Sequence, residues 1–302
     1  MKKRSFKENV PHHVYARGIG GGIIFYCLED CIYFITLYFC IAQKYVIATF
    51  AFSLMPNHVH AQQMARDRAT FTAFNREVFG KFAVTYNRQH GRSGPLFDKP
   101  FGSAPKQVGK KIKANISYIC NNGAEGRLSK GVLDYKWNLV AYCMESNPFS
   151  ARVPNRGSSR KFLRARKLVM YNRERLKPLD YKIQEIVYRG LDAEEKKRVI
   201  DLILSEYNFL DQNGMKLSFG SLEKALSAME ANCGSEYDIK EDWDDYSVYR
   251  RMGLYAVRRG IDLRDVDFGR MSSKELRQWR LRLQTSVSAS DRQLDKYLHM
   301  NL

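Results

Sequence analysis

The sequence predicts an α+β protein, with a mostly antiparallel sheet and packed helices in the N-terminal half and a mainly helical C-terminal region. In the first half, short apolar runs alternate with longer stretches of helical periodicity. In the second half, almost every periodic stretch is helical. Hydrophobic residues make up 44% of the 302 residues, which excludes wholesale disorder and indicates a globular chain.

Seven segments of the N-terminal half are predicted in the order β-α-β-β-α-β-α. Runs rich in β-branched and aromatic residues mark the strands, and apolar stripes at helical spacing mark the helices. The predicted strands are His13–Gly18, Tyr45–Leu54, His58–Met64 and Leu96–Ala104, and the predicted helices are Leu28–Gln43, Phe71–Gln89 and Val108–Asn122. This order implies a mostly antiparallel sheet with helices on one side or both.

The C-terminal part is predicted to be helical almost throughout. The first predicted helix is capped by Asp192 and runs through Tyr207. The helices predicted after it are Ser221–Ala231, Trp243–Val257, Ser273–Leu283 and Ser290–Leu298. The last of these has a pattern typical of the second helix of a helix-turn-helix. An amphipathic helix that packs on the rest of the chain is the alternative.

The net charge of +18 is confined to the first 182 residues. Residues 1–150 hold 20 basic and 9 acidic side chains, residues 151–182 hold 11 and 2, and residues 183–302 hold 19 and 21, which gives +11, +9 and −2. Proline, glycine and serine mark a boundary near residue 150. We therefore predict a first domain over 1–150, a basic linker or helix over 151–182 and a helical accessory domain over 183–302. The excess positive charge predicts a polyanionic partner, either nucleic acid or an acidic membrane.

Cysteine usage and the N-terminus favour the cytoplasm. The six cysteines form no CxxC pair and indicate reduced thiols; Cys27 and Cys31 could share a metal, but no second pair accompanies them. No apolar stretch follows the charged N-terminus, so no signal peptide is expected. The apolar stretch from Ile32 to Phe52 is interrupted by Gln43 and Lys44, and predicts a buried helix and strand rather than a membrane span.

Two pairs of residues carry chemistry. His58 and His60 stand at i and i+2 of a predicted strand, so their imidazoles project from one face and could bind a divalent cation. Tyr118 and Asn122 stand at i and i+4 of a predicted helix, where an amide oxygen could complete a site for a hard cation beside the phenol. The alternatives are a core histidine with a surface histidine, and a tyrosine that belongs to the core.

Four motifs, in this order, resemble the single-tyrosine HUH transposases, and more narrowly the group that includes the REP-associated tyrosine transposases. They are His13-Val-Tyr-Ala-Arg-Gly18, Leu54-Met-Pro-Asn-His-Val-His60, the run from Tyr86 to Phe97, and Tyr118-Ile-Cys-Asn-Asn122, followed by an aromatic-rich end at Asp134–Tyr142. The resemblance covers roughly residues 10–150. It implies the RRM-like, ferredoxin-like sheet of HUH nucleases, with Tyr118 as nucleophile and His58, His60 and Asn122 as metal ligands.

The resemblance implies an enzyme of transposition and DNA recombination. It would cleave and rejoin single-stranded DNA through a 5′-phosphotyrosine, with Mg²⁺ or Mn²⁺ preferred over the Zn²⁺ that imidazoles alone would favour. The alternative is a catalytically quiescent DNA-binding protein, a repressor or structural factor, derived from such an enzyme. The His-x-His-x-His nucleotide hydrolases fit poorly because Gln62 stands at the third position. Gln62 is instead an auxiliary ligand candidate, and Gly123, where the family has proline, is expected to loosen the catalytic helix.

The expected partner is single-stranded DNA with a hairpin or repeats, bound by a monomer or a homodimer. A basic groove with stacking aromatics suits a single strand, although each cation could equally be a solvated surface charge. The candidate DNA contacts are Arg17, Arg88, Arg92, Lys110, Lys111 and Lys113. The stretch Arg152–Lys182 could add a basic helix that grips flanking DNA.

Overall fold

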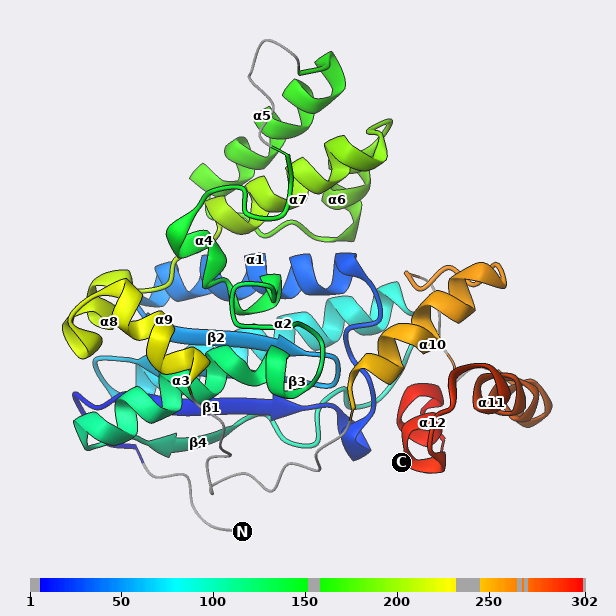
Figure 1. The fold of residues 1–302 in the computed structure, drawn as a ribbon, viewed down its shortest axis with the longest axis horizontal. Coiled ribbons are helices and arrows are strands. Elements are labelled where there is room, and N and C mark those ends of the chain that lie inside the picture. Colours follow the sequence, from blue (N-terminus) through cyan, green and yellow to red (C-terminus); the bar gives the residue numbers. More distant parts are fainter. Residues whose placement is uncertain (1–5, 152–157, 232–244, 265–267, 269–270, 301–302) are drawn as a thin grey trace.

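The computed structural model describes residues 6–151, 158–231, 245–264, 268 and 271–300. The strands in this part of the chain form one sheet in the order β2-β3-β1-β4, and every neighbouring pair is antiparallel (Figure 1). They are β1 (His12–Arg17), β2 (Ala48–Met55), β3 (His58–Met64) and β4 (Gly102–Pro105). The predicted class, an antiparallel sheet with packed helices followed by a mainly helical region, is confirmed.

Three long helices cover the two faces of this sheet. They are α1 (Leu28–Tyr45), α2 (Arg68–Gln89) and α3 (Gly109–Glu125). On one face, the ring centroid of Phe52 lies 4.9 Å from that of Tyr38 and 5.4 Å from that of Phe39, both on α1. Tyr38 in turn contacts Phe74 of α2 at 5.3 Å. The other face lies under α3, which crosses in front of the strands in Figure 1.

The predicted boundaries hold where local signals are strong and shift where a turn intervenes. The strand His58–Met64 is observed as predicted. The preceding strand begins only at Ala48, because Val46 takes a left-handed conformation with φ of 53° that ends α1. Only the end of the predicted strand Leu96–Ala104 pairs with the sheet, as β4. Pro100 cannot donate a backbone hydrogen bond to a neighbouring strand. Earlier in this segment, Phe97 forms a single bridge to Gly18.

Short helices make up most of the remaining described chain. They are η1 (Ile19–Gly21), η2 (Lys136–Asn138), α4 (Ala141–Met144), α5 (Arg160–Glu174), α6 (Tyr181–Tyr188), α7 (Ala193–Glu206), α8 (Gln212–Phe219), α9 (Leu222–Glu230), α10 (Ser247–Arg258), α11 (Ser273–Val287) and α12 (Asp291–Leu298). Asp192 caps α7 as predicted, whereas α6 and α8 were not predicted, and Trp243 lies outside the described residues. No described helix is both long enough and apolar enough to cross a membrane.

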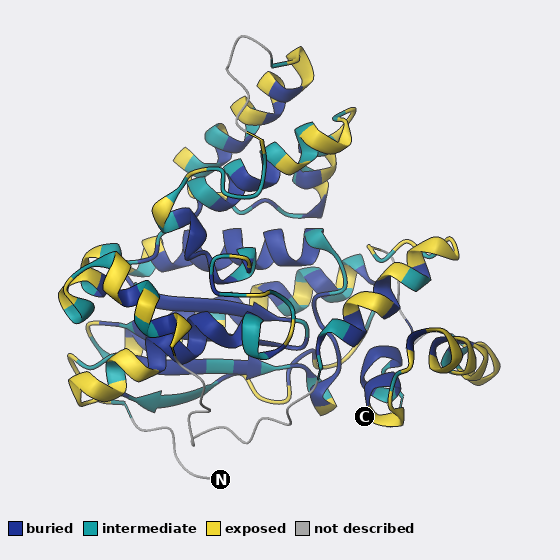
Figure 2. Cartoon of the chain, viewed as in Figure 1, coloured by how far each residue is buried: buried dark blue, intermediate teal, exposed yellow. Residues whose placement is uncertain are grey.

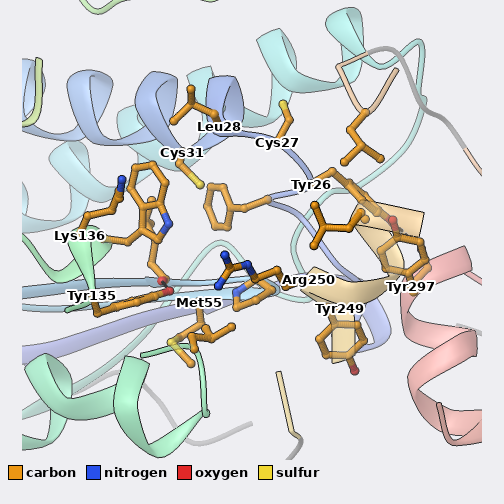
Figure 3. Close-up of a pocket in the computed structure, with 18 of the residues that line it drawn as sticks. Tyr26, Cys27, Leu28, Cys31, Met55, Tyr135, Lys136, Tyr249, Arg250 and Tyr297 are labelled. Carbon is orange, nitrogen blue, oxygen red and sulfur yellow. Dashed lines mark hydrogen bonds between the residues drawn. The ribbon is translucent and has the colours of Figure 1, made fainter. Parts of the chain in front are cut away.

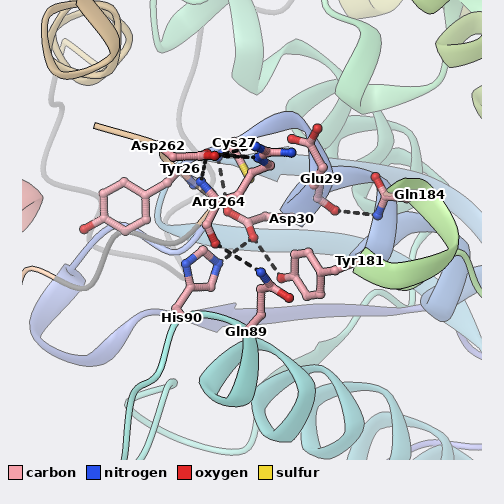
Figure 4. A network of polar contacts seen from close by, with 10 residues as sticks. All are labelled: Tyr26, Cys27, Glu29, Asp30, Gln89, His90, Tyr181, Gln184, Asp262 and Arg264. Atoms are coloured by element: carbon pink, nitrogen blue, oxygen red, sulfur yellow. Dashed lines mark hydrogen bonds and ion pairs between the residues drawn. The ribbon is translucent and has the colours of Figure 1, made fainter. Parts of the chain in front are cut away.

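A buried polar network ties the start of α1 to the end of α2 and to α6 (Figure 4). Asp30 Oδ1 lies 2.8 Å from His90 Nε2 and accepts a 2.8 Å hydrogen bond from the Tyr181 hydroxyl. Asp30 Oδ2 accepts from the backbone N–H groups of Tyr26 and Cys27 at 3.0 and 3.1 Å. Burial and the Asp30 charge raise the pKa of Tyr181, which keeps it a neutral donor. This network fixes the N-terminus of α1 against helices that follow residue 158.

The C-terminal helices α10–α12 form a second apolar cluster at the end of the sheet where β2 turns into β3. Its members include Ile23, Met55 and Tyr135 from the N-terminal part. The backbone N–H of Ile23 donates to Lys296 O at 3.2 Å, and α12 is largely buried, with Lys296 only 3% exposed. In Figure 2 the central strands and α1 are buried, while α5 and α11 carry much of the exposed surface. The burial of α12 favours a packing helix at the position where the sequence also suggested a helix-turn-helix.

Candidate active site

Side-chain alternation puts a row of polar residues on the α3 face of the sheet. Directly opposed residues of an antiparallel pair share a face. The opposed pairs on this face are Arg17 with His58, Tyr15 with His60, and His13 with Gln62. His13, His58, His60 and Gln62 are all buried. The predicted placement of the two histidines on one face therefore agrees with the strand register.

The helix α3 runs over this row in the direction opposite to β3. Near its start, Gln62 Nε2 donates to Ile112 O at 3.1 Å and to Asn115 Oδ1 at 2.9 Å. About one turn beyond Asn115, the Tyr118 ring lies 5.7 Å from the His60 ring, measured between centroids. Tyr118 is 1% exposed, so its phenol is enclosed between helix and sheet.

Asn122 lies one turn beyond Tyr118, toward the His58 end of the row. The end of α3 is fixed there because Gly126 packs directly on Met55, the residue opposed to His58. Asn122 is 3% exposed, and its Nδ2 has no hydrogen-bond partner among the described residues. The helix continues to Glu125, so the expected loosening after Asn122 is not observed. Gly123 instead makes room for the Tyr135 ring, which would lie 2.3 Å from a Cβ at that position.

The two imidazoles stand close together and nearly perpendicular. Their centroids are 4.7 Å apart with an interplanar angle of 82°. Asn57 Nδ2 donates to Gly21 O at 2.8 Å, which turns its Oδ1 toward His58 Nδ1 at 2.7 Å. Because an amide oxygen only accepts, Nδ1 of His58 must carry the proton, and Nε2 of the neutral ring carries the lone pair. Metal-binding histidines are commonly oriented in this way.

His13 is a member of the site that we did not predict. Its Nε2 lies 2.9 Å from His60 Nδ1, and its ring centroid is 6.0 Å from that of Tyr118. When Nδ1 of His60 is the donor in this contact, Nε2 of His60 carries the lone pair. The sequence did contain a signal, since His13 begins the first motif, but its placement beside His60 depends on the register between β1 and β3.

The donors on this face fit a divalent cation held by nitrogen and oxygen together. Within the described ranges, no group of three or more histidine, cysteine, aspartate or glutamate side chains is placed to hold a metal ion. A cation here would therefore need amide oxygens beside the two imidazoles. Gln62 Oε1 is buried and has no hydrogen-bond partner in the described structure, and Asn122 supplies a second buried amide. Mixed imidazole and amide ligands are compatible with Mg²⁺ or Mn²⁺.

Of the six basic residues predicted to contact DNA, only Arg17 lies beside the histidines. Arg17 is opposed to His58 in the strand pairing. Gly21, whose φ is 76°, makes room for the Arg17 guanidinium, because a Cβ on residue 21 would lie 2.8 Å from Nη2 of Arg17. The other five are distributed elsewhere: Lys110, Lys111 and Lys113 at the far end of α3, and Arg88 and Arg92 at the end of α2. The basic helix α5 packs on α6 and α7, outside α1 and away from the α3 face (Figure 1).

A residue from the C-terminal region closes the His58 end of the site. The Tyr246 ring, just before α10, lies 5.9 Å from the His58 ring and contacts Gly126 of the α3 terminus. His58 is consequently 6% exposed. The Tyr246 ring therefore limits access to His58 from this end of the site.

Comparison of the chain with protein-family models, with curated proteins and with solved structures finds no match.

Proposed function

We propose that this protein is a metal-dependent enzyme that cleaves and rejoins single-stranded DNA through Tyr118, as the motif resemblance implies. The observation that carries the proposal is the contact of Tyr118 with His60, at 5.7 Å between ring centroids, on the face that also holds His58. The element order β-α-β-β-α-β and the strand order β4-β1-β3-β2 support the finer fold assignment, an RRM-like, ferredoxin-like HUH sheet.

The phenol of Tyr118 supplies the nucleophile. Its oxygen forms a bond to phosphorus while the bond from phosphorus to the 3′-oxygen breaks; the phenol loses its proton and the departing 3′-oxygen gains one, which leaves a 5′-phosphotyrosine and a free 3′-OH. Because one phosphoester linkage replaces another, the enzyme can pass the strand to a second 3′-OH without an external energy source. Tyr118 is 1% exposed between α3 and β3, so attack on a strand requires the site to open.

His58 and His60 would hold the cation through Nε2, with amide oxygens of Asn122 and Gln62 as further ligands. When bound, a divalent cation neutralises and polarises the phosphodiester, which otherwise resists attack by an anion or a phenol. Asn57 and His13 orient the two imidazoles through their Nδ1 atoms. Arg17, opposed to His58, is the nearest candidate to contact the phosphate backbone of the strand.

One observation favours the alternative, a quiescent DNA-binding protein. His58 is 6% exposed and Tyr118 is 1% exposed, so the site is closed in this conformation. The alternative predicts DNA binding without covalent chemistry under any metal condition.

Incubation with end-labelled single-stranded DNA and Mn²⁺, followed by a denaturing gel, separates the two functions. The enzyme is expected to form a covalent adduct that disappears in Tyr118→Phe, while the affinity for DNA changes less than about twofold. The matched control is Tyr86→Phe, which removes the hydroxyl of another buried tyrosine, on the α1 side, and should leave the adduct unchanged. An adduct that persists in Tyr118→Phe would exclude Tyr118 as the nucleophile, and the absence of any adduct would favour the quiescent binder.

A further inference from the structure

A pocket of about 670 Å³ lies between the end of β2, the start of α1, the η2 segment and α10. Its walls are mainly apolar, and they include six aromatic side chains: Phe25, Tyr26, Tyr135, Trp137, Tyr249 and Tyr297. Figure 3 shows the Arg250 side chain across the middle of the pocket, with Tyr135 and Lys136 on one side and Tyr249 and Tyr297 on the other. This volume is in the range that accommodates one small organic ligand.

The charged side chains that line the pocket favour an anion. They are Lys136, Arg250 and Asp134, two cations and one acid; Arg250 and Asp134 are exposed, and Lys136 is partly buried. Neither cation makes an ion pair with an acidic residue that the structure describes; Lys136 Nζ instead lies 4.9 Å from the centroid of the Phe149 ring. Burial lowers the pKa of Lys136, and the nearby charges of Lys197 and Arg250 lower it further while Asp201 opposes them. A bound anion would relieve both the desolvation and the repulsion.

The thiols in the pocket add no charge. Burial, together with the charges of Asp30 and Glu29, raises the pKa values of Cys27 and Cys31 well above the ordinary thiol value. Both side chains are therefore neutral and contribute apolar wall at physiological pH. The pocket thus combines flat aromatic surfaces with two cations, a combination that suits a stacked base joined to a phosphate.

The pocket adjoins the candidate active site through two pairs of residues. Tyr249 lines the pocket and lies 5.8 Å from Tyr246, whose ring contacts His58. On the other side, Tyr135 lines the pocket and packs on Gly123, next to Asn122. A strand that enters the site past Tyr246 would therefore bring a neighbouring nucleotide to the mouth of this pocket.

We infer that this pocket binds one unstacked nucleotide of the single-stranded DNA next to the position that is cleaved. The base stacks on the aromatic wall that includes Trp137 and Tyr249, and the adjoining phosphate contacts Arg250 and Lys136. This inference rests on the proposed function, because the single strand is the substrate assigned there. It assigns to residues beyond the four motifs a role in holding the strand.

Binding can be measured without chemistry by fluorescence anisotropy of a labelled 20-nucleotide single strand of mixed sequence, in the Tyr118→Phe background and without divalent cation. Arg250→Ala and Lys136→Met are each expected to weaken binding about five- to tenfold, as for the loss of one charge-assisted phosphate contact. The matched control is Arg251→Ala, on the same helix but outside the pocket, where its Nη1 contacts Ser247 Oγ at 2.9 Å. It should change affinity less than twofold. Equal effects of Arg250→Ala and Arg251→Ala would overturn the inference, because they would indicate only the general attraction of a cationic surface.

A strand with 2-aminopurine at successive positions tests the stacking itself. One position is expected to lose fluorescence on binding and to recover it in Trp137→Leu, with thermal unfolding compared to confirm that the variant is folded. No position-dependent quenching, or quenching that persists in Trp137→Leu, would overturn the assignment. The two proposals can fail separately. If no covalent adduct forms but the pocket variants lose affinity, the nucleotide pocket is supported and the proposed cleavage chemistry is excluded. If adducts form while the pocket variants bind like Arg251→Ala, the cleavage chemistry is supported and the nucleotide pocket is excluded.

Discussion

The α1 side of the sheet and the α3 side are both buried, but with opposite chemistry. On the α1 side, Phe34, Tyr38 and Phe52 interlock as an aromatic core, and Phe34 and Phe52 are fully enclosed. On the α3 side, the strands β1 and β3 place His13, His60 and Gln62 under helix residues such as Tyr118. One face is thus mainly aromatic, although it also buries Thr49 and Gln63 against Tyr38, and the other carries a row of polar side chains.

This difference indicates how the molecule divides its tasks. Burying aromatic side chains is favourable by roughly 1.5–3 kcal/mol each, whereas a buried polar group is tolerated only when it is hydrogen-bonded. A row of histidine and amide side chains is thus a poor way to stabilise a sheet, and Gln62 Oε1 and Asn122 Nδ2 even lack described partners. Such local departures from good packing are expected at functional sites. The α1 side provides stability, and the α3 side is where chemistry is expected.

The largest effect should come from removing an aromatic ring on the α1 side. Phe52→Ala leaves a cavity against Tyr38 and Phe39, and is expected to lower the free energy of unfolding by about 3–5 kcal/mol. Urea unfolding followed by circular dichroism measures this loss. Adduct formation per folded molecule should be retained at low temperature. A loss below about 1 kcal/mol would contradict the division between the two faces.

A substitution on the α3 face of the neighbouring strand should instead lower activity and leave stability nearly unchanged. His60→Asn keeps an amide near the position of Nδ1, and so keeps the contact with His13, but removes Nε2. Adduct formation with Mn²⁺ is expected to fall at least about 100-fold, equivalent to about 2.7 kcal/mol of transition-state stabilisation. The free energy of unfolding should change by only about 1 kcal/mol, because no large apolar group is lost. Wild-type adduct yield in this variant would remove His60 from the proposed site.

How far the sequence predicts these two layers depends on whether the signal is local. The strand His58–Met64 and the helix that carries Tyr118 follow from period-two and helical patterns within the segments themselves. The position of His13 beside His60 does not, because a shift of one residue in the register between β1 and β3 would turn His13 to the other face.

Contacts between segments far apart in the sequence could not be predicted either, because they depend on how the elements pack and not on a local pattern. Nothing near Tyr246 indicates that it packs on His58, since about 190 residues separate them and the contact depends on how α10–α12 dock. The lysines at the start of α3 were expected near the site from their spacing along the helix. The antiparallel course of α3 over β3 instead places them at the Gln62 end.

A smaller effect is expected from the residue that orients His60. His13→Leu removes the partner of His60 Nδ1, and should weaken Mn²⁺ binding about 10-fold, within the range typical of the groups that orient metal ligands. His13→Gln places an amide near the position of Nε2 and should restore most of the affinity. Calorimetric titration with Mn²⁺ measures both, and an excess of Mn²⁺ should recover adduct formation in His13→Leu. A merely structural role predicts equal losses in both variants and no recovery with metal.

The smallest effect concerns a second polar clamp between α1 and α2, at the other end of α1 from the Asp30 network, where Glu77 of α2 joins the end of α1. Burial raises its pKa, but hydrogen bonds from Lys81, Lys44 and Tyr45 prevail and lower the pKa of Glu77 to about 2. A carboxyl whose pKa is lower in the folded state stabilises the fold above its unfolded pKa of about 4.3, and this contribution is lost as the pH falls toward 2. Glu77→Gln should therefore cost on the order of 1–2 kcal/mol at pH 7, after allowance for solvent screening of Lys44 and Lys81.

Urea unfolding at a series of pH values tests this clamp. The difference between wild type and Glu77→Gln should shrink from pH 5 downward. The control Glu185→Gln removes the acid of an exposed pair with Arg189 at 3.9 Å and should change stability by less than about 0.5 kcal/mol at every pH. A Glu77→Gln deficit that stays constant down to pH 2.5 would mean that the carboxylate charge is not what joins α1 to α2. The end of α1 would then be held on α2 by packing rather than by this charge.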